Sequence, residues 1–431
     1  MADTAQASRA RRAASQSFKS VTCPFCSLLC DDLEIRNHNG ELQVTANGCP
    51  RAVAGFQRPL VNAAPRAEGK PVALDKAIAA AAALFKRAQH PLIGGLATDV
   101  AGMRALLDVA DLTGSIVDHM HGDALSRNML ALQNRGWMTT TLTEIRNRAD
   151  LIVFAGTDVI ADHPRFFERY VWNRESMFGM STSAREIVYL GEGLDPDAGV
   201  SPDGRKPWHL KNEPKRLGEL IAAARALLAG RCLQAHTVAG IKIRDVAKLV
   251  DKLISAKYGV IVWAPNRFNF AGADLTVEMI CELVKELNAG TRCSGLSLGG
   301  NDGAVTAGAV CTWQSGYPLR TDFARGYPEY DPTANAATAL LAAGEVDLLL
   351  WVTSFSAHAL PTTTVPTILL APPIARPPAW CSVYIPVGTP GVDHRGQMCR
   401  VDNVVSLPLH KLRDSALPTV ESIAQRLLQL I

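Results

Sequence analysis

The segment ADLIVFAG, residues 149–156, decides the fold class of this 431-residue chain. It is a nearly continuous apolar run that ends in a turn residue, without the alternation of a half-exposed strand. Such runs are typical of strands that are buried on both faces of a parallel sheet. Runs of the same kind recur at residues 91–96, 185–192, 258–266, 346–354, 366–372 and 382–388.

Segments with helical spacing separate these predicted strands. They cover residues 73–88, 101–114, 214–229, 242–256, 271–289 and 333–343. Strands that alternate with helices predict an α/β fold built from doubly wound, Rossmann-like parallel sheets. We expect a first α/β segment at 66–150, a second α/β domain at 151–330, and a third segment at 331–431 that returns to pack with the first.

The first 65 residues have a different character. Residues 1–20 are rich in Arg, Ala and Ser and poor in acids, which predicts a disordered tail. Residues 21–65 are expected to form a small cysteine-rich module. Within it, LEIRNHNGELQVTANG at 33–48 predicts a hairpin that turns at Asn39-Gly40.

The overall composition excludes several classes of protein. The chain is 48% hydrophobic and 20% charged, as expected for a globular protein with a sizeable core. Its net charge of +3 is too small to indicate nucleic acid as a partner. No apolar stretch approaches the roughly 18–20 residues of a membrane helix. We therefore expect a cytoplasmic protein that binds neither nucleic acid nor membrane.

Four of the ten cysteines gather near the N-terminus. Cys23, Cys26 and Cys30 lie in VTCPFCSLLCDD, and Cys49 follows in NGCP. Short spacings let one loop aim several thiolates at a single centre, which a more distant cysteine closes. The spacing favours a [4Fe–4S] cluster over zinc, and an empty site stays open as a third interpretation.

Two further features suggest a ligand pocket. The stretches 149–166 and 346–363 share an acid, an apolar strand, a polar loop and a histidine, so Thr157, His163 and His358 are expected at the carboxyl ends of strands, where α/β sheets bind ligands. All βαβ units are partly alike, so this similarity stays a hypothesis. Residues 291–332 have the composition of a long functional loop; they contain Asn301, Trp313 and Arg325.

The motifs CPFCSLLCDDLEI, GTDVIADHPRF, TWQSGYPLRTDFARGYPEYDP and RVDNV together resemble a known family. They are similar to the molybdopterin/tungstopterin oxidoreductases, and most of all to the B subunit of formylmethanofuran dehydrogenase. The resemblance extends over residues 20–410. It implies a formate dehydrogenase-like fold, in which a small iron–sulfur domain lies against two α/β domains that hold a bis-pterin metal cofactor.

One residue departs from the family pattern. The resemblance places a metal-ligating cysteine before His121-Gly122, where this chain has Met120. A thioether cannot ionise to a thiolate and is a poor ligand for a hard, high-valent metal. We therefore expect no catalytic residue and no molybdopterin or tungstopterin. The residues that would line the vestigial pocket are His119, His121, Thr157, His163, Asn301, Trp313, Arg325 and His358.

This departure resembles the B subunit of bacterial formyltransferase/hydrolase complexes. The resemblance implies a non-redox chain that serves as a scaffold or tunnel wall. Its partners would be an amidohydrolase-like A subunit, a formyltransferase D subunit and a C subunit. The complex would transfer formyl from tetrahydromethanopterin to a methanofuran-like carrier and hydrolyse it to formate. Two alternatives stay open: an active tungsten or molybdenum dehydrogenase, and an iron–sulfur relay or sensing module.

Overall fold

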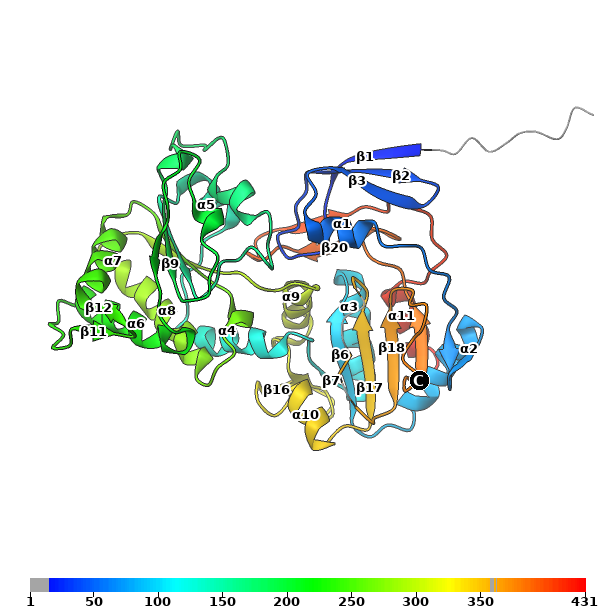
Figure 1. Ribbon diagram of the computed structural model, residues 1–431. Helices are drawn as coiled ribbons and strands as arrows, with labels where there is room; N and C mark the ends of the chain where they lie inside the picture. The colour runs from blue at the N-terminus through cyan, green and yellow to red at the C-terminus, as the bar shows by residue number, and fades with distance from the viewer. Residues whose placement is uncertain (1–14, 357–359, 362) are drawn as a thin grey trace, which may run out of the picture.

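The computed structural model describes residues 15–356, 360–361 and 363–431. The chain forms two large sheets with helices on both faces, and a small N-terminal sheet lies beside them (Figure 1). The predicted α/β class with doubly wound parallel sheets is confirmed. None of the helices in the described residues is long and apolar enough to span a bilayer.

The N-terminal sheet has three antiparallel strands in the order β1-β2-β3, and a short helix follows it. At the β2–β3 turn, Asn39 and Gly40 have φ values of 54° and 90°, as a tight type I′ hairpin requires. The elements are β1 (Ser15–Val21), β2 (Leu33–His38), β3 (Glu41–Ala46) and α1 (Pro50–Phe56).

The start of β1 corrects the prediction of a disordered tail over residues 1–20. Residues 15–20 belong to β1, whose backbone pairs with β2 from Ser15 onward. These backbone hydrogen bonds hold a polar segment in extended form although its side chains bury little. The rest of that prediction, residues 1–14, lies outside the described residues.

The larger sheet has nine strands in the order β16-β15-β7-β6-β17-β18-β19-β4-β5. Strands β7, β6, β17, β18 and β19 are mutually parallel, and the strand order reverses between β6 and β17. The strands are β4 (Arg66–Ala67), β5 (Lys70–Pro71), β6 (Pro91–Ala97), β7 (Ile116–Val117), β15 (Thr321–Asp322), β16 (Glu329–Tyr330), β17 (Leu348–Thr353), β18 (Thr367–Ala371) and β19 (Val383–Pro386).

Both faces of this sheet are covered, which explains why its strands are continuously apolar. Leu348, Leu350 and Val352 of β17 face helices α2, α3, α9 and α11. Leu349 and Trp351 point the other way, toward α10. The helices are α2 (Leu74–Phe85), α3 (Val100–Thr113), α9 (Ala304–Ser315), α10 (Ala337–Ala343) and α11 (Val420–Leu428).

A glycine in β6 lets its central partner approach closely. Gly95 has a φ of 77°, and a Cβ there would lie 2.4 Å from the carbonyl oxygen of Val352. The register between β6 and β17 shifts at this point. Glycine therefore permits the register shift, after which the two strands pair again at Ala97 and Thr353.

The second large sheet has five strands, all parallel, in the order β10-β9-β8-β13-β14. Its order reverses between β8 and β13. Helices α4, α6, α7 and α8 cover one face, and α5 and η1 (Phe167–Val171) contribute to the other together with the cysteine-rich loop. The elements are β8 (Leu151–Ala155), β9 (Glu186–Leu190), β10 (Trp208–Leu210), β13 (Gly259–Trp263), β14 (Cys293–Ser297), α4 (Gly122–Arg135), α5 (Leu142–Arg148), α6 (Leu217–Leu228), α7 (Ile243–Ser255) and α8 (Ala273–Leu287).

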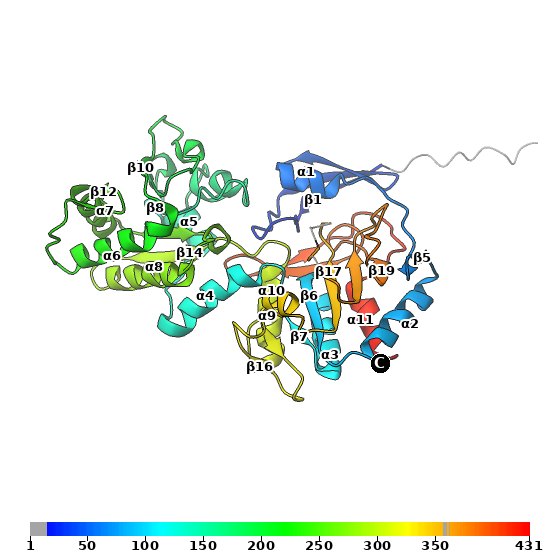
Figure 2. The same ribbon diagram turned by 60° about the horizontal axis from the view of Figure 1, so that its bottom comes forward.

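The chain crosses between the large sheets earlier than the predicted boundaries at 150 and 330. Helix α4 packs against α8 of the five-stranded sheet, so the first crossing follows β7. The chain returns between β14 and α9, because α9 packs on α3 and β15 pairs with β7. Both views show α4 between the two sheets (Figures 1 and 2).

The predicted loop at 291–332 is also corrected. Its residues form β14, α9, β15 and β16. Within α9 the buried residues are mostly small, among them Ala304, Ala307 and Ala309, which let the helix lie close to α3. The remaining strands of the described residues form two short antiparallel ribbons: β11 (Thr237–Val238) with β12 (Ile241–Lys242), and β20 (Gly396–Cys399) with β21 (Ser406–Leu409).

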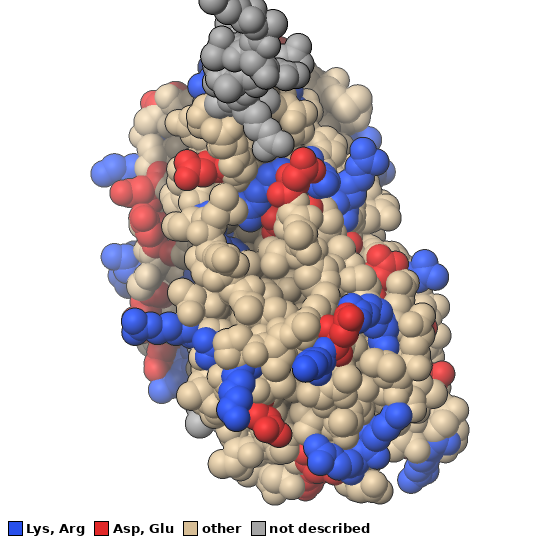
Figure 3. Space-filling model, turned by 90° about the vertical axis from the view of Figure 1, so that its right-hand side faces the viewer, with Lys and Arg blue, Asp and Glu red and all other residues tan. Residues whose placement is uncertain are grey.

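The surface charge is finely mixed on the side of the molecule that Figure 3 presents. Basic and acidic side chains alternate across this face without a large area of one sign. This pattern agrees with the small net charge of +3 and gives this face no strong field for a polyanion.

Candidate functional site

Polar residues follow the central strands of both sheets at their carboxyl ends. In the nine-stranded sheet, Thr98 and Asp99 follow β6, and Ser354 follows β17, on either side of the point where the strand order reverses. In the five-stranded sheet, Thr157 follows β8, and its hydroxyl accepts a hydrogen bond from the amide of Val159 (3.1 Å). Ligands of open α/β sheets bind at such reversals. These edges therefore define the candidate site.

The turn at residues 298–303, after β14, joins three parts of the chain. The amide of Ser27, in the cysteine-rich loop, donates to Oδ1 of Asn301 (3.0 Å). The Ser27 hydroxyl donates to the carbonyl oxygen of Gly299 and lies 2.9 Å from Nε2 of His163. Because the serine proton is directed to Gly299, His163 donates from Nε2. Its Nδ1 atom then has no hydrogen-bond partner among the described residues.

His163 is a packed, neutral side chain. It is 1% exposed. Burial lowers the pKa of its imidazole to about 4, against the opposing effect of the neighbouring Asp162 carboxylate. At pH 7 the ring is therefore uncharged. In this arrangement it holds the loop after β8 against Ser27.

His119 and His121 meet Asp302 where the two sheets approach each other. The amide of His121 donates to Nδ1 of His119 (3.0 Å), so the proton of His119 is on Nε2, 3.1 Å from the carbonyl oxygen of Asp302. Nε2 of His121 lies 3.0 Å from Oδ2 of Asp302. The His121 side chain is 38% exposed and that of Asp302 only 8%. The structure thus unites two predicted pocket histidines with a carboxylate from the other sheet.

Met120 lies between these histidines, and its thioether packs in apolar surroundings. Its amide donates to the carbonyl oxygen of Gly95 (3.2 Å). Its half-buried side chain packs against a cluster that contains Leu29, Phe355 and Met398. A thioether has no proton to lose, so it cannot supply the anionic sulfur that a pterin-bound tungsten or molybdenum would need here. The residues present do not fit that metal.

A buried carboxylate supports the turn that carries these residues. Asp118 accepts hydrogen bonds from the amides of His119 (2.8 Å) and Ala337 (2.9 Å), and Arg320 lies 3.4 Å away. Burial raises the pKa of Asp118 to about 6, although Arg320 opposes the shift. A Cβ on Gly122 would lie only 2.2 Å from Oδ1 of Asp118. Glycine after His121 therefore has a structural reason: it leaves room for the carboxylate.

The four clustered cysteines lie in one neighbourhood within an apolar core. The amide of Cys23 donates to the carbonyl oxygen of Cys30 (2.8 Å), which closes the loop. Cys49 caps helix α1 beside it and is half-buried. Burial raises the pKa of the Cys23 thiol, and the charge of Cys26 raises it further. Burial also raises the pKa of Cys26 to about 12.

The four cysteines are free thiols in this structure. Within residues 15–356, 360–361 and 363–431, no three Cys, His, Asp or Glu side chains are placed to hold a metal ion. Cys23, Cys26 and Cys30 instead pack with Leu28, Leu33 and neighbouring apolar residues against the five-stranded sheet. The charges of Cys26, Cys30 and Cys49 all act on the Cys23 thiol, so the four cysteines lie close to one another, and their donor set has the composition of an iron–sulfur site.

Trp313 and Arg325 are placed away from the pocket for which they were predicted. Trp313 is 63% exposed and lies nine residues along α9, about 14 Å from the helix start beside Thr98. Strand β15 runs antiparallel to β7, so the chain beyond Asp322 leads to the amino end of β7 rather than to His119. There Arg325 pairs with Glu329 (3.2 Å). The remaining predicted pocket residue, His358, lies outside the described residues.

Sequence reasoning did not identify Ser27, Asp118 or Asp302 as members of this site. Asp302 adjoins the predicted Asn301 in the turn GGNDG, and Asp118 immediately precedes His119. Their positions next to predicted site residues could have identified both aspartates from the sequence. Ser27 lay among the cysteines, and nothing in the sequence indicated its contact with a turn more than 270 residues away.

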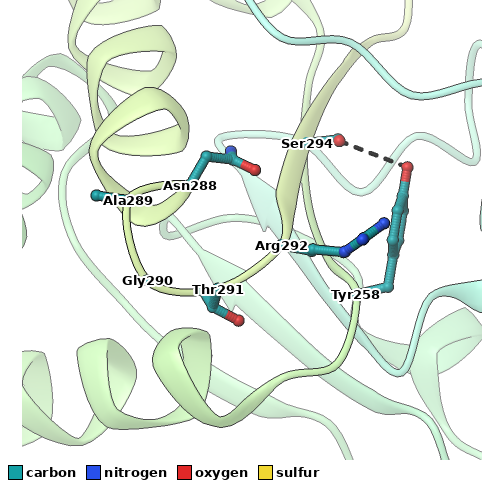
Figure 4. A pocket seen from close by; sticks show the side chains of 7 residues that line it. All are labelled: Tyr258, Asn288, Ala289, Gly290, Thr291, Arg292 and Ser294. Atoms are coloured by element: carbon teal, nitrogen blue, oxygen red, sulfur yellow. Dashed lines mark hydrogen bonds between the residues drawn. The ribbon is translucent and has the colours of Figure 1, made fainter.

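A pocket of about 580 Å³ lies elsewhere, at the amino ends of β13 and β14. It is shallow and lined by Tyr258 and the turn 288–294 (Figure 4). In Figure 4 the Tyr258 hydroxyl points to Ser294, at 3.4 Å. Because it opens at the amino edge of the sheet, it is separate from the carboxyl-edge site.

Comparisons with known proteins identify relatives along most of the chain. No family model matches. The chain is 30% identical over 412 residues to the B subunit of the tungsten-containing formylmethanofuran dehydrogenase 2 from Methanocaldococcus jannaschii, and the match covers 92% of this chain and 94% of that protein. It is 29% identical over 294 residues to the B subunit of the formyltransferase/hydrolase complex Fhc from Methylorubrum extorquens, covering 66% and 73%.

Solved structures give the same picture of the fold. A chain of the formyltransferase/hydrolase complex FhcABCD from Methylorubrum extorquens, solved with methylofuran, superposes with a TM-score of 0.73 at 25% identity. The match covers 85% of this chain and 98% of that one. Acetylene hydratase from Pelobacter acetylenicus superposes with a TM-score of 0.62 at 10% identity, over 95% and 69%, which shows a shared fold.

Proposed function

This chain belongs to the family of formylmethanofuran dehydrogenase B subunits, and from that premise we propose that it is a non-redox B subunit of a formyltransferase/hydrolase complex. Such a complex would move a formyl group from tetrahydromethanopterin to a methanofuran-like carrier and hydrolyse it to formate, a step of formaldehyde oxidation. The chain would act as a scaffold and as part of the wall along which the carrier passes.

The observation that carries this proposal is the surroundings of Met120. The thioether stands where the family resemblance expects a metal-ligating cysteine, and it packs against apolar side chains. The flanking His119 and His121 are engaged with Asp302. Hydrolysis of a formamide transfers no electrons, so a B subunit without a redox centre is compatible with that reaction. A water activated by a metal in the A subunit would supply the nucleophile.

The proposed partners are an amidohydrolase-like A subunit, a formyltransferase D subunit and a C subunit. The match to a chain of FhcABCD supports assembly into a complex of this kind. A permanent complex would bury on the order of 2,000 Å² or more at its interfaces. The exposed aromatic residues Trp313, Tyr317 and Tyr327 are suited to such a contact, since aromatic side chains are enriched in interface cores.

The test is purification of the native complex with simultaneous analysis of its subunits and metals. We expect the chain to co-purify with an amidohydrolase-like subunit, without stoichiometric tungsten or molybdenum in this chain. Deletion of the chain should abolish hydrolysis of the formylated carrier. A stable monomer, together with unchanged hydrolysis in the deletion strain, would refute the scaffold role.

A second candidate is an active tungsten-dependent dehydrogenase subunit. The name of the relative from Methanocaldococcus jannaschii favours it, because that protein is called tungsten-containing. Tungsten or molybdenum bound together with iron would establish this candidate. Iron alone would instead support a relay or sensing module that uses Cys23, Cys26, Cys30 and Cys49.

A further inference from the structure

A pocket of about 400 Å³ at the amino edge of the five-stranded sheet is strongly cationic. It lies between the starts of β9 and β10, the loop that joins them and one side of helix α7. Among its lining residues one carboxylate, Glu186, faces five cationic side chains. The cations are Arg185, Arg205, Lys206, Lys248 and Lys252.

The single carboxylate of the lining is already engaged. Glu186 forms an ion pair with Lys252. Arg205 donates to the carbonyl oxygens of Ser183 and Arg185, which fixes its guanidinium beside the pocket. Four cations therefore remain after the one acid of the lining is paired. At physiological ionic strength charges are screened over about 8 Å, so these cations reinforce one another across a pocket of this size.

Arg185 adds a charge that is built into the fold. It is 1% exposed, and its donors go to the carbonyl oxygens of Tyr170 and Arg146 and to Oδ1 of Asn173. Its Nε has no hydrogen-bond partner among the described residues. Burial lowers the pKa of Arg185 to about 10, which still leaves it protonated at pH 7. The carboxylate of Asp150 partly offsets the charge of Arg185 from a distance, but the guanidinium itself is bonded to carbonyl oxygens and an amide rather than to a carboxylate.

One wall of the pocket is aromatic. The ammonium group of Lys248 lies over the ring of Trp208, 5.0 Å from its centroid. A cation–π contact of this kind restricts a lysine that would otherwise move freely in solvent. It holds the Lys248 charge beside the pocket.

We propose that this pocket binds a small polyanion that carries two or more phosphate or carboxylate groups. Several cations around a partly enclosed volume match a ligand with several anionic groups, because each group can form its own charge-assisted hydrogen bonds. The half-buried Trp208 offers an apolar surface for the part of the ligand that links these groups. The inference is independent of the proposed function, since the pocket opens at the opposite edge of the sheet from the candidate site.

Isothermal titration calorimetry on the full chain tests the proposal, with pyrophosphate and citrate titrated separately at pH 7 and about 50 mM salt. We expect the double variant Lys206→Glu/Lys248→Glu to weaken binding roughly tenfold or more. The matched control is Lys70→Glu/Lys86→Glu, which changes the net charge equally at exposed lysines outside this pocket. The control should bind like the wild type.

Each result has a definite meaning. Binding of pyrophosphate alone would show that the pocket accepts phosphate groups, and binding of citrate alone would show that it accepts carboxylates. Binding of both anions would show that it accepts either kind of group. Failure of both anions to bind the wild type would overturn the proposal, as would equal weakening in the control. If the double variant melts early by circular dichroism, the single variant Lys206→Glu in the exposed loop takes its place, with an intermediate loss expected.

Discussion

The amide of Ser27 donates a hydrogen bond to the side chain of Asn301, 274 residues away, at 3.0 Å. This contact ties the cysteine-rich loop to the turn after β14, from which Asp302 reaches His119 and His121. The N-terminal module is therefore part of the frame that positions the candidate site.

Replacement of Ser27 by Ala should destabilise the protein by about 1–3 kcal/mol, because Nε2 of buried His163 and the carbonyl of Gly299 would each lose a partner. Urea unfolding measures the change. The matched control is Ser181→Ala, in an exposed turn, which should stay within about 0.5 kcal/mol of the wild type. Equal effects of the two substitutions would refute the structural role of Ser27.

His163 should make the protein less stable in mild acid. Its folded pKa of about 4 lies below its ordinary value of 6.5, so between these values the unfolded chain binds more protons. The stability from this group is present above pH 6.5 and falls by on the order of 3 kcal/mol toward pH 4. His163→Gln, which can still donate to Ser27, should remove this loss. Urea unfolding from pH 4 to 7 measures it, and parallel curves for the two proteins would contradict the assignment.

Asp118 should have the opposite pH dependence. Its folded pKa of about 6 lies above its ordinary value of 3.8, so between these values the folded chain binds more protons. Its contribution to stability is present below pH 3.8 and declines by on the order of 3 kcal/mol as the pH rises to 6. Asp118→Asn should abolish that decline. Because His163 has the opposite effect over much of this range, the comparison is between the variant and the wild type: an unchanged difference in stability from pH 4 to 6 would show that Asp118 does not titrate as described.

The buried thiols should resist alkylation in the folded protein. Burial raises the pKa of Cys26 to about 12, while Cys232 is exposed. Because the thiolate is the nucleophile, iodoacetamide at pH 8 should modify Cys232 first and Cys26 only on unfolding. Peptide mass spectrometry gives the order. Faster labelling of Cys26 after treatment with a chelator would show that a metal had protected it, whereas unchanged labelling is expected from packing alone.

Substitution of Gly122 by Ala should destabilise the turn that carries His121. The added Cβ would lie 2.2 Å from Oδ1 of Asp118, at a cost of about 1–3 kcal/mol. Gly308→Ala is the matched control, since no atom lies within 4 Å of its added Cβ in helix α9. There the better helix propensity of Ala should stabilise the protein by up to about 1 kcal/mol. Thermal unfolding of both variants checks the opposite signs.

The strands were predictable because strands that are buried on both faces have continuous apolar sequences. Strand β8 is apolar throughout and β17 is apolar up to its last residue, Thr353, and each lies at the centre of its sheet. Helix α9 escaped detection because its buried residues are small and its Gly and Thr residues obscure the period. The predicted boundaries at 150 and 330 failed for a related reason: strand partners, rather than local composition, decide which sheet a segment joins.

The candidate site was predictable only in part. His119, His121 and Asn301 were identified from their loops, and the structure brings them to one place through Asp302 and Ser27. Trp313 and Arg325 were predicted at the pocket because their residue types are suited to binding. Their actual positions depend on the direction of α9 and on the antiparallel pairing of β15, which the composition of the segment does not reveal.

The early crossing between the sheets has a consequence for biosynthesis. Strand β6 cannot pair with its central partner, β17, until β17 has been synthesised. The hydrogen-bonded residues Ala97 and Ser354 are 257 positions apart in the chain. At translation rates of roughly 5–20 residues per second, β6 emerges about 13–50 s before the sheet can close. The whole five-stranded sheet is synthesised in this interval and can fold first. Nascent β6, apolar on both faces, is then the segment of this chain that most needs a chaperone.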